Sequence, residues 1–255
     1  MPSSATLHKT VAWAVHLFTA MGVLFAGLAL LSILNGNPSK CIFWLAVALV
    51  VDGVDGTLAR KFKVQKALPE VDGSALDLII DYLNYVFIPV LFMYYYTPFP
   101  LYLGLFALGC VLVSSLYCFS NIGMKSYDFY FVGFPATWNI VALYFYLLKL
   151  PSSYNLIITL ILCVLTFSKI KLLHPFRVRF LMPINILMTG IWFATSLILA
   201  IGHPGSLTDR VIWGLWVISS IYVLGISLWR TFFKEKKEPP FFEAVSYTHL
   251  RAHET

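Results

Sequence analysis

Residues 47–60 read VALVVDGVDGTLAR, and residues 71–83 read VDGSALDLIIDYL. Each stretch has two aspartates inside an apolar run, Asp52 and Asp55 in the first and Asp77 and Asp81 in the second, where Asp72 precedes the run. Positions three or four apart share one face of a helix, so each pair presents its carboxylates together. A short charged connection joins the stretches. The sequence therefore predicts two neighbouring helices that hold four carboxylates at similar depth.

Outward from these stretches, most of the chain is apolar. Hydrophobic residues make up 59% and charged residues 12% of the 255 positions, whereas soluble domains have about 45–50% and 25%. Apolar runs of bilayer length recur along the chain. The predicted fold class is an all-α polytopic membrane protein, a helical bundle of about eight transmembrane helices, which excludes a soluble enzyme. The expected segments are 11–34, 41–59, 75–96, 101–119, 134–150, 153–168, 181–201 and 211–229.

The basic residues predict the orientation of these segments, because Lys and Arg concentrate in cytoplasmic connections. With eight spans and both termini cytoplasmic, fifteen of the eighteen Lys and Arg residues lie on the inside. Lys40, Lys149 and Arg210 lie outside. Topology thus explains the net charge of +6, and we expect no nucleic acid as a partner.

The composition changes after Phe232, where the chain becomes rich in Lys and Glu. We expect one transmembrane domain over residues 1–237, with the aspartate motif at 52–81, and a disordered tail over residues 238–255. The last ten residues, 246–255, read SYTHLRAHET and resemble translated sequencing-adapter read-through. We interpret them as non-native, so their two histidines are not candidate metal ligands.

Four aspartates within membrane helices need compensation, because each ionised one costs roughly 2.5–3.5 kcal/mol to insert. Hard divalent cations with oxygen ligands, Mg²⁺ or Mn²⁺, supply it. One alternative is that the acids pair with the basic residues at positions 60–66, but such pairing does not require two carboxylates on one helix face. Another is a cation transporter, which favours acids at the bilayer midplane and two related halves. The sequence shows no second copy of the motif.

The spaced residues Asp52-x2-Asp55-Gly56-x2-Ala59-Arg60-x12-Gly73-x3-Asp77-x3-Asp81 resemble the signature of the CDP-alcohol phosphotransferases. The twelve residues between Arg60 and Gly73 exceed the commonest spacing of that family and resemble the bacterial phosphatidylcholine synthases within it. Weaker similarity extends to about residue 237. It includes Gly133-Phe134-Pro135, Trp138-Asn139 and His174-Pro175.

This resemblance implies transfer of a phosphatidyl group from CDP-diacylglycerol to choline, giving phosphatidylcholine and CMP. It implies a multi-pass protein of the bacterial inner (cytoplasmic) membrane, with its active site facing the cytoplasm, and it suggests a homodimer. Asp52, Asp55, Asp77 and Asp81 would form a site for Mn²⁺ or Mg²⁺, with two ions expected. Asp81 would also be the general base, or alternatively a metal ligand alone. The residues expected to line the CDP pocket are Gly56, Ala59, Arg60 and Gly73.

The choline site is predicted from chemistry, because a quaternary ammonium is held on aromatic faces through cation–π attraction. A nearby carboxylate would add charge complementarity. The candidates are Tyr82, Tyr85, Asp128 and Trp138. Arg177 and Arg179 are candidates for gripping a lipid phosphate. The alternative hypothesis keeps the family but changes the acceptor to glycerol 3-phosphate, serine or inositol, and the two arginines would also suit a phosphorylated acceptor.

Overall fold

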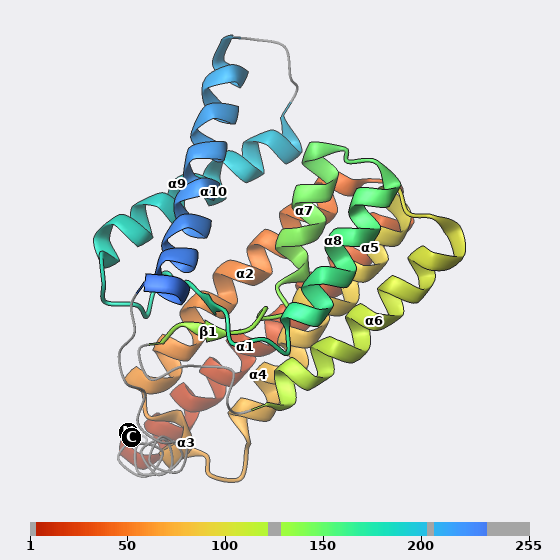
Figure 1. Ribbon diagram of the computed structural model, residues 1–255. Coiled ribbons are helices and arrows are strands. Elements are labelled where there is room, and N and C mark those ends of the chain that lie inside the picture. The colour runs from red at the N-terminus through yellow and green to blue at the C-terminus, as the bar shows by residue number, and fades with distance from the viewer. Residues whose placement is uncertain (1–3, 122–128, 203–206, 234–255) are drawn as a thin grey trace.

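The structure is a computed structural model that describes residues 4–121, 129–202 and 207–233. The predicted tail at 238–255 and Asp128 lie outside these residues. Tilted helices form a bundle, with one helix pair at its side and two short strands between (Figure 1). The elements are α1 (Ser4–Leu34), α2 (Pro38–Lys61), α3 (Val64–Ala67), α4 (Gly73–Tyr82), the π-helix η1 (Leu83–Phe87), α5 (Ile88–Tyr96), α6 (Leu101–Ser120), β1 (Phe131–Val132), α7 (Trp138–Leu148), α8 (Ser152–Leu165), β2 (Lys171–Leu172), α9 (Met182–Ile201) and α10 (Leu207–Phe233).

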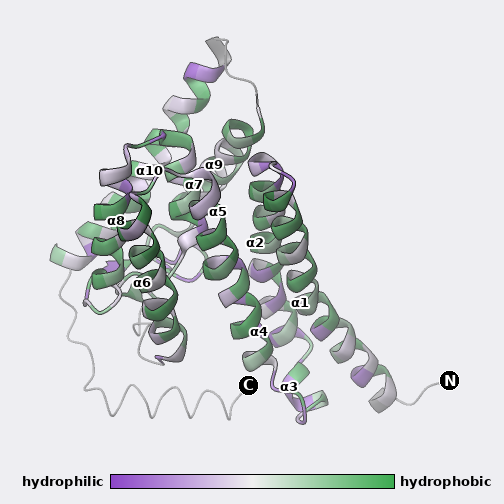
Figure 2. Ribbon diagram, turned by 90° about the vertical axis from the view of Figure 1, so that its right-hand side faces the viewer, coloured by the Kyte–Doolittle hydropathy of each residue, from purple (hydrophilic) through white to green (hydrophobic). Residues whose placement is uncertain are grey.

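Six helices of the described chain are long and apolar enough to cross a bilayer. The prediction of a mostly helical, multi-pass membrane protein is therefore confirmed. Hydrophilic residues gather around α3 and the adjoining ends of α1, α2 and α4, whereas most other helical surface is apolar (Figure 2). The six spans are Thr6–Leu34, Pro38–Lys61, Gly73–Tyr96, Leu101–Ser120, Met182–Ile201 and Asp209–Phe232.

The fifth and sixth predicted segments are helical over shorter lengths than expected. The apolar helices α7 and α8 have only 11 and 14 residues. The chain before α7 is used by strand β1 and by a turn at Gly133, whose φ of +78° and whose closeness to Thr166 O leave no room for a side chain. The two helices pack against α5 and α6, respectively. Apolarity alone predicted their existence but not where they begin and end.

Helices α1 and α2 form a hairpin that frames the aspartate motif. Gly36 makes the turn with φ +68°, a conformation that glycine adopts without steric cost. Asn37 then caps α2, its side-chain oxygen accepting from Lys40 N at 3.0 Å, and Pro38 occupies the first helical turn. These are common helix-start residues. The hairpin places the second half of α2 beside α1, so polar side chains of both helices can meet.

The third span begins at a cap and contains a widened turn. The Asp72 carboxylate accepts from the backbone N–H groups of Ser74 and Ala75 at 3.0 and 3.1 Å, which starts α4. After the 10 residues of α4, the helix widens into η1, where Ile88 N–H bonds to Leu83 O. Pro89 follows directly and has no backbone N–H to donate, so the regular bonding pattern is interrupted at this position.

A two-stranded antiparallel ribbon joins the connections on either side of α7 and α8. Phe131 pairs with Leu172 and Val132 pairs with Lys171. Gly133 N–H also donates to Ile170 O at 2.8 Å. The ribbon fixes the chain ahead of α9 against the body of the bundle. It thereby sets the position of the short segment 174–180, which carries the two candidate arginines.

Packing of α1 on α4 depends on Gly22, because a Cβ there would lie 2.5 Å from Ile80 Cγ2. We expect Gly22→Ala to lower the free energy of unfolding by about 1–3 kcal/mol, the usual cost of overpacking. Thermal unfolding in detergent measures it. Gly27→Ala is the matched control on the same helix, since nothing lies within 4 Å of its added methyl. Equal stability of the two variants would contradict this packing.

Candidate active site

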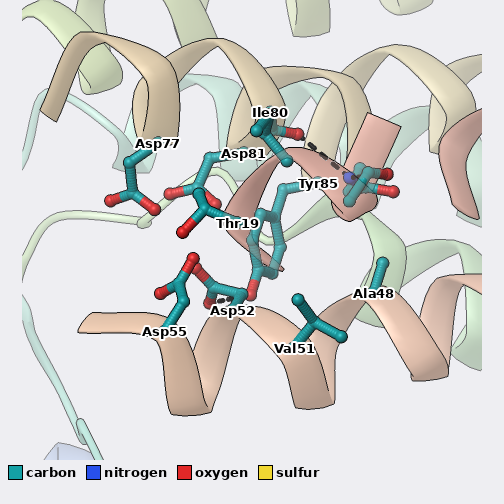
Figure 3. Close-up of a pocket in the computed structure, with 11 residues that line it drawn as sticks. Thr19, Ala48, Val51, Asp52, Asp55, Asp77, Ile80, Asp81 and Tyr85 are labelled. Atoms are coloured by element: carbon teal, nitrogen blue, oxygen red, sulfur yellow. Dashed lines mark hydrogen bonds between the residues drawn. The ribbon is translucent and has the colours of Figure 1, made fainter. Parts of the chain in front are cut away.

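The four motif aspartates meet in one pocket between α2 and α4 (Figure 3). Carboxylate oxygens of Asp52, Asp55 and Asp77 all lie within 4.8 Å of one another. Asp81 lines the same pocket and is hydrogen-bonded to the Asp52 side chain. Asp55 is 5% exposed, and the other three are partly buried. The spacing in the sequence thus produces the expected convergence.

Two hydroxyl groups orient these carboxylates. The Tyr85 hydroxyl donates to Asp52 Oδ2 at 2.7 Å, and the Thr19 hydroxyl bonds to the Asp55 side chain. Bonds to ionised acceptors are stronger than neutral ones. Thr19 comes from α1 and was missed by sequence reasoning. Its signal was only that of one small polar residue in a long apolar run.

The π turn places a second polar group at the pocket. Asn84 Nδ2 donates to Gly22 O and to Ile80 O, both at 3.1 Å. Its Oδ1 atom is buried and has no hydrogen-bond partner within the described residues. Both Asn84 and Tyr85 belong to η1, and both contact other helices. The widened turn therefore ties α4 to α1 and α2 beside the acids.

This donor set fits a divalent cation. Carboxylate oxygens are the ligands that Mg²⁺ and Mn²⁺ prefer, and supporting hydroxyls of the kind seen here orient metal ligands. Two carboxylates in hydrogen-bond contact, as Asp52 and Asp81 are, need a proton or a cation between them. The cluster can therefore hold a metal ion.

The residues expected at the CDP pocket continue from the acids along α2 and the start of α4. A Cβ on Gly56 would lie 3.4 Å from Arg60 Nη1, and Arg60 Nη2 bonds to Thr57 Oγ1 at 3.3 Å. A Cβ on Gly73 would lie 3.0 Å from the His16 ring. The two glycines therefore leave space beside a guanidinium and an imidazole. Ala59 packs under this end of α2, against the cluster around Val64 and Leu68.

Arg177 approaches the acids from the segment after β2. Loss of hydration lowers the pKa of its guanidinium, repulsion from Arg60 acts in the same direction, and attraction to Asp52 and Asp77 opposes both. The side chain keeps exposed surface, and an arginine remains charged under such shifts. Two guanidinium groups thus face the carboxylates from different segments. Arg179 is also exposed, and it is not among the described residues that line the pocket.

The aromatic candidates for choline occupy three different environments. The Tyr85 ring lines the acid pocket. Tyr82 lies on the neighbouring face, where its hydroxyl donates to Leu112 O at 3.0 Å. Trp138 is fully buried in the main core, and its indole N–H donates to Ser115 Oγ at 3.0 Å. Trp138 therefore has a core environment and is not among the residues that line the pocket.

Comparison with known proteins shows the family to which the chain belongs. The model of the CDP-alcohol phosphatidyltransferase family matches residues 12–168, which include the whole aspartate motif. The chain belongs to this family. It is 52% identical over 229 residues to phosphatidylcholine synthase of Pseudomonas aeruginosa, covering 90% of this chain and 95% of the relative.

Two further relatives carry the same name. Phosphatidylcholine synthase of Borreliella burgdorferi is 41% identical, covering 72% of this chain and 78% of the relative. Phosphatidylcholine synthase of Agrobacterium fabrum is 35% identical, covering 83% of this chain and 87% of the relative. The CDP-alcohol phosphatidyltransferase match ends within the connection after α8. Helices α9 and α10 lie outside the residues that the family model matches.

Proposed function

We propose that this protein transfers a phosphatidyl group from CDP-diacylglycerol to choline, forming phosphatidylcholine and releasing CMP. The observation that carries the proposal is the four-carboxylate pocket in a chain 52% identical to a phosphatidylcholine synthase. Family membership supports the reaction type, and the relatives support the acceptor. The pocket offers carboxylates for the two roles that the proposed reaction needs, a proton acceptor and metal ligands.

Asp81 acts as the general base in this proposal. The choline hydroxyl gives its proton to the Asp81 carboxylate while the choline oxygen attacks the phosphorus of the phosphatidyl group. The bond from that phosphorus to the oxygen of CMP breaks, and CMP leaves. A positioned carboxylate typically contributes 10²–10⁴-fold to such a step. No described side chain needs to form a covalent intermediate. The runner-up role for Asp81 is that of a metal ligand alone.

The remaining acids hold the donor. We propose that Asp52, Asp55 and Asp77, with Asp81, bind Mn²⁺ or Mg²⁺, with two ions as the expected number. When bound, these ions would neutralise charge on the pyrophosphate and on the leaving phosphate. Arg60 and Arg177 add positive charge beside the acids. The small residues Gly56, Ala59 and Gly73 are proposed to line the nucleotide pocket. Arg179 remains a candidate contact for a lipid phosphate.

Choline recognition is proposed to use the Tyr85 ring, which lies in the pocket beside the acids. Its hydroxyl is bonded to Asp52, so the same side chain would orient a metal ligand and face the trimethylammonium group. A cation on an aromatic face gains about 0.5–2 kcal/mol. Tyr82 borders this region, and Asp128 remains a prediction outside the described residues.

The acceptor is tested with the full chain in lipid vesicles that contain CDP-diacylglycerol and Mn²⁺. CMP release is measured with choline, glycerol 3-phosphate, serine or inositol. We expect choline to stimulate release and the other three alcohols to leave it near background. Stimulation by glycerol 3-phosphate, serine or inositol in place of choline would overturn the acceptor while keeping the family chemistry.

The orientation is also a proposal. We propose that α7 and α8 complete an eight-helix membrane domain of a bacterial inner membrane, with both termini and the pocket on the cytoplasmic side and a homodimer as the assembly. The excess of basic residues in the proposed inside connections supports the orientation. A periplasm-dependent reporter enzyme is expected to be active when inserted between α9 and α10, and inactive when fused after α10. The reverse pattern would contradict this topology.

Removing the Tyr85 hydroxyl is expected to weaken the metal site without unfolding the protein. In Tyr85→Phe, Asp52 loses its 2.7 Å bond, and loss of such a supporting contact typically costs about 10–100-fold in metal affinity or activity. The measurement is the Mn²⁺ dependence of CMP release. Tyr96→Phe is the matched control, because it removes a 2.8 Å bond to Ile33 O from the same span, away from the acids. Equal Mn²⁺ dependence in the two variants would exclude this role for Tyr85.

A further inference from the structure

An apolar groove runs between α2, α7 and α9, beside the carboxylate pocket but separate from it. Its α2 wall includes Ile42, Leu45 and Leu49, and its α9 wall includes Trp192, Phe193 and Leu197. The α9 wall lies beyond the residues that match the family model. The groove is therefore formed partly by a helix outside the residues that the family model matches.

Polar atoms of three residues that line this groove already have partners. Trp192 Nε1 donates to the Tyr144 hydroxyl at 2.9 Å, and that hydroxyl donates to Ser220 at 2.6 Å. Ser196 Oγ accepts from Trp216 Nε1 at 3.0 Å. On α7, Asn139 Oδ1 accepts from Ile140 N–H at 2.9 Å. The lining thus offers an occupant mainly hydrocarbon surface, which suits an apolar ligand and disfavours choline or a nucleotide.

The groove begins beside the proposed reaction centre. Leu49 precedes Asp52 by one helical turn, and Leu45 and Ile42 continue along the same side of α2. Ten residues separate Asp52 from Ile42, or about 15 Å at 1.5 Å per residue. That is about half of the ~30 Å hydrocarbon core, which is the depth of one leaflet. At the far end, Ser39 Oγ donates to Ala200 O at 2.6 Å and ties α2 to α9.

We propose that this groove binds one fatty acyl chain of the phosphatidyl group while the phosphate of the same lipid lies at the carboxylates. The proposal rests on the proposed function for the identity of the lipid. A chain attached to a phosphate beside Asp52 enters the groove at Leu49 and runs toward Ile42. Helix α9 then acts as a binding wall that aligns the donor, in addition to crossing the membrane.

The chain offers matched substitutions on both walls. Ala46 lines the groove, whereas Val50, one turn further along α2, is 51% exposed and is not among the lining residues. Ala46→Phe fills the groove, and Val50→Phe adds the same ring outside it. On α9, Leu197→Trp fills the groove, and its neighbour Ile198, which is 48% exposed, supplies the control Ile198→Trp.

The experiment uses the full chain in vesicles with a CDP-diacylglycerol probe that carries a photoreactive diazirine near the end of one acyl chain. After illumination, labelled residues are mapped by mass spectrometry. We expect labels on the groove residues of α2, α7 and α9 that excess dioleoyl CDP-diacylglycerol suppresses. Because Ala46→Phe and Leu197→Trp fill the groove, we expect them to reduce these labels at least about fivefold, and the two controls to leave them unchanged.

Mapping on the unaltered protein decides the proposal by itself. Labels confined to outward-facing residues such as Val50 and Ile198, or groove labels that excess donor does not suppress, would overturn it. Choline-dependent CMP release, measured in parallel, separates this result from the proposed function. Choline-dependent CMP release together with labels only outside the groove would contradict the acyl-chain site and leave the proposed function intact. Groove labels that excess donor suppresses, without choline-dependent CMP release, would support the acyl-chain site and contradict choline as the acceptor.

Discussion

Replacing Asp81 with asparagine is expected to lower kcat for choline-dependent CMP release by about 10²–10⁴-fold, because the choline hydroxyl loses its proton acceptor. The substitution keeps the size of the side chain and leaves Asp52, Asp55 and Asp77 in their 4.8 Å cluster. Binding of CDP-diacylglycerol should therefore persist. The measurement is kcat at saturating Mn²⁺, with donor binding followed separately.

The same variant distinguishes the two roles of Asp81. A general base cannot be replaced by added metal, so we expect kcat to stay low at every Mn²⁺ concentration. Recovery of kcat at high Mn²⁺ would instead show that Asp81 is a metal ligand alone. Asp72→Asn is the matched control, since Asp72 is exposed, caps α4 and lies outside the pocket. Asparagine is an equally good cap, so this control should retain activity.

Loss of the metal site is the second large effect expected. Asp55 is the most buried of the four acids, at 5% exposure, and is held by Thr19. In Asp55→Asn, one anionic ligand disappears from a site that depends on negative charge. Loss of a residue that only supports a metal ligand typically costs about 10–100-fold in activity. Because Asp55 is itself a proposed ligand, we expect its loss to cost at least about 100-fold at ordinary Mn²⁺ concentrations. The Mn²⁺ dependence of CMP release measures it.

Removal of the ions should reproduce this loss in the unaltered protein. A chelator is expected to abolish CMP release, and added Mn²⁺ or Mg²⁺ to restore it. Thr19→Val supplies an intermediate case, because it removes only the hydroxyl that bonds to Asp55. Full activity in the chelator, or unchanged activity in Asp55→Asn, would contradict a metal-dependent reaction at this pocket.

The sequence predicted the convergence of the acids because helical spacing is local. Asp52 with Asp55, and Asp77 with Asp81, share faces by periodicity alone, and the short connection leaves their helices adjacent. The membrane class followed in the same way from the length of the apolar runs. These features need no knowledge of distant contacts.

The rest depends on contacts between distant segments, which periodicity does not encode. Thr19 reaches Asp55 only because α1 and α2 form a hairpin, and Arg177 approaches the acids only because β1 and β2 pair. Tyr85 lies in the π turn before Pro89 and donates to Asp52, so a residue expected to contact choline is also bonded to a proposed metal ligand. The burial of Trp138 in the main core also depends on distant contacts, which its place in the sequence does not reveal.

The central claim is transfer of phosphatidyl from CDP-diacylglycerol to the choline oxygen, and one labelling measurement tests it most directly. The full chain in vesicles receives CDP-diacylglycerol, Mn²⁺ and choline whose hydroxyl oxygen is ¹⁸O, and the lipids and CMP are analysed by mass spectrometry. We predict phosphatidylcholine that contains ¹⁸O, formed together with an equal amount of unlabelled CMP. Absence of phosphatidylcholine, or phosphatidylcholine without ¹⁸O, would contradict the account.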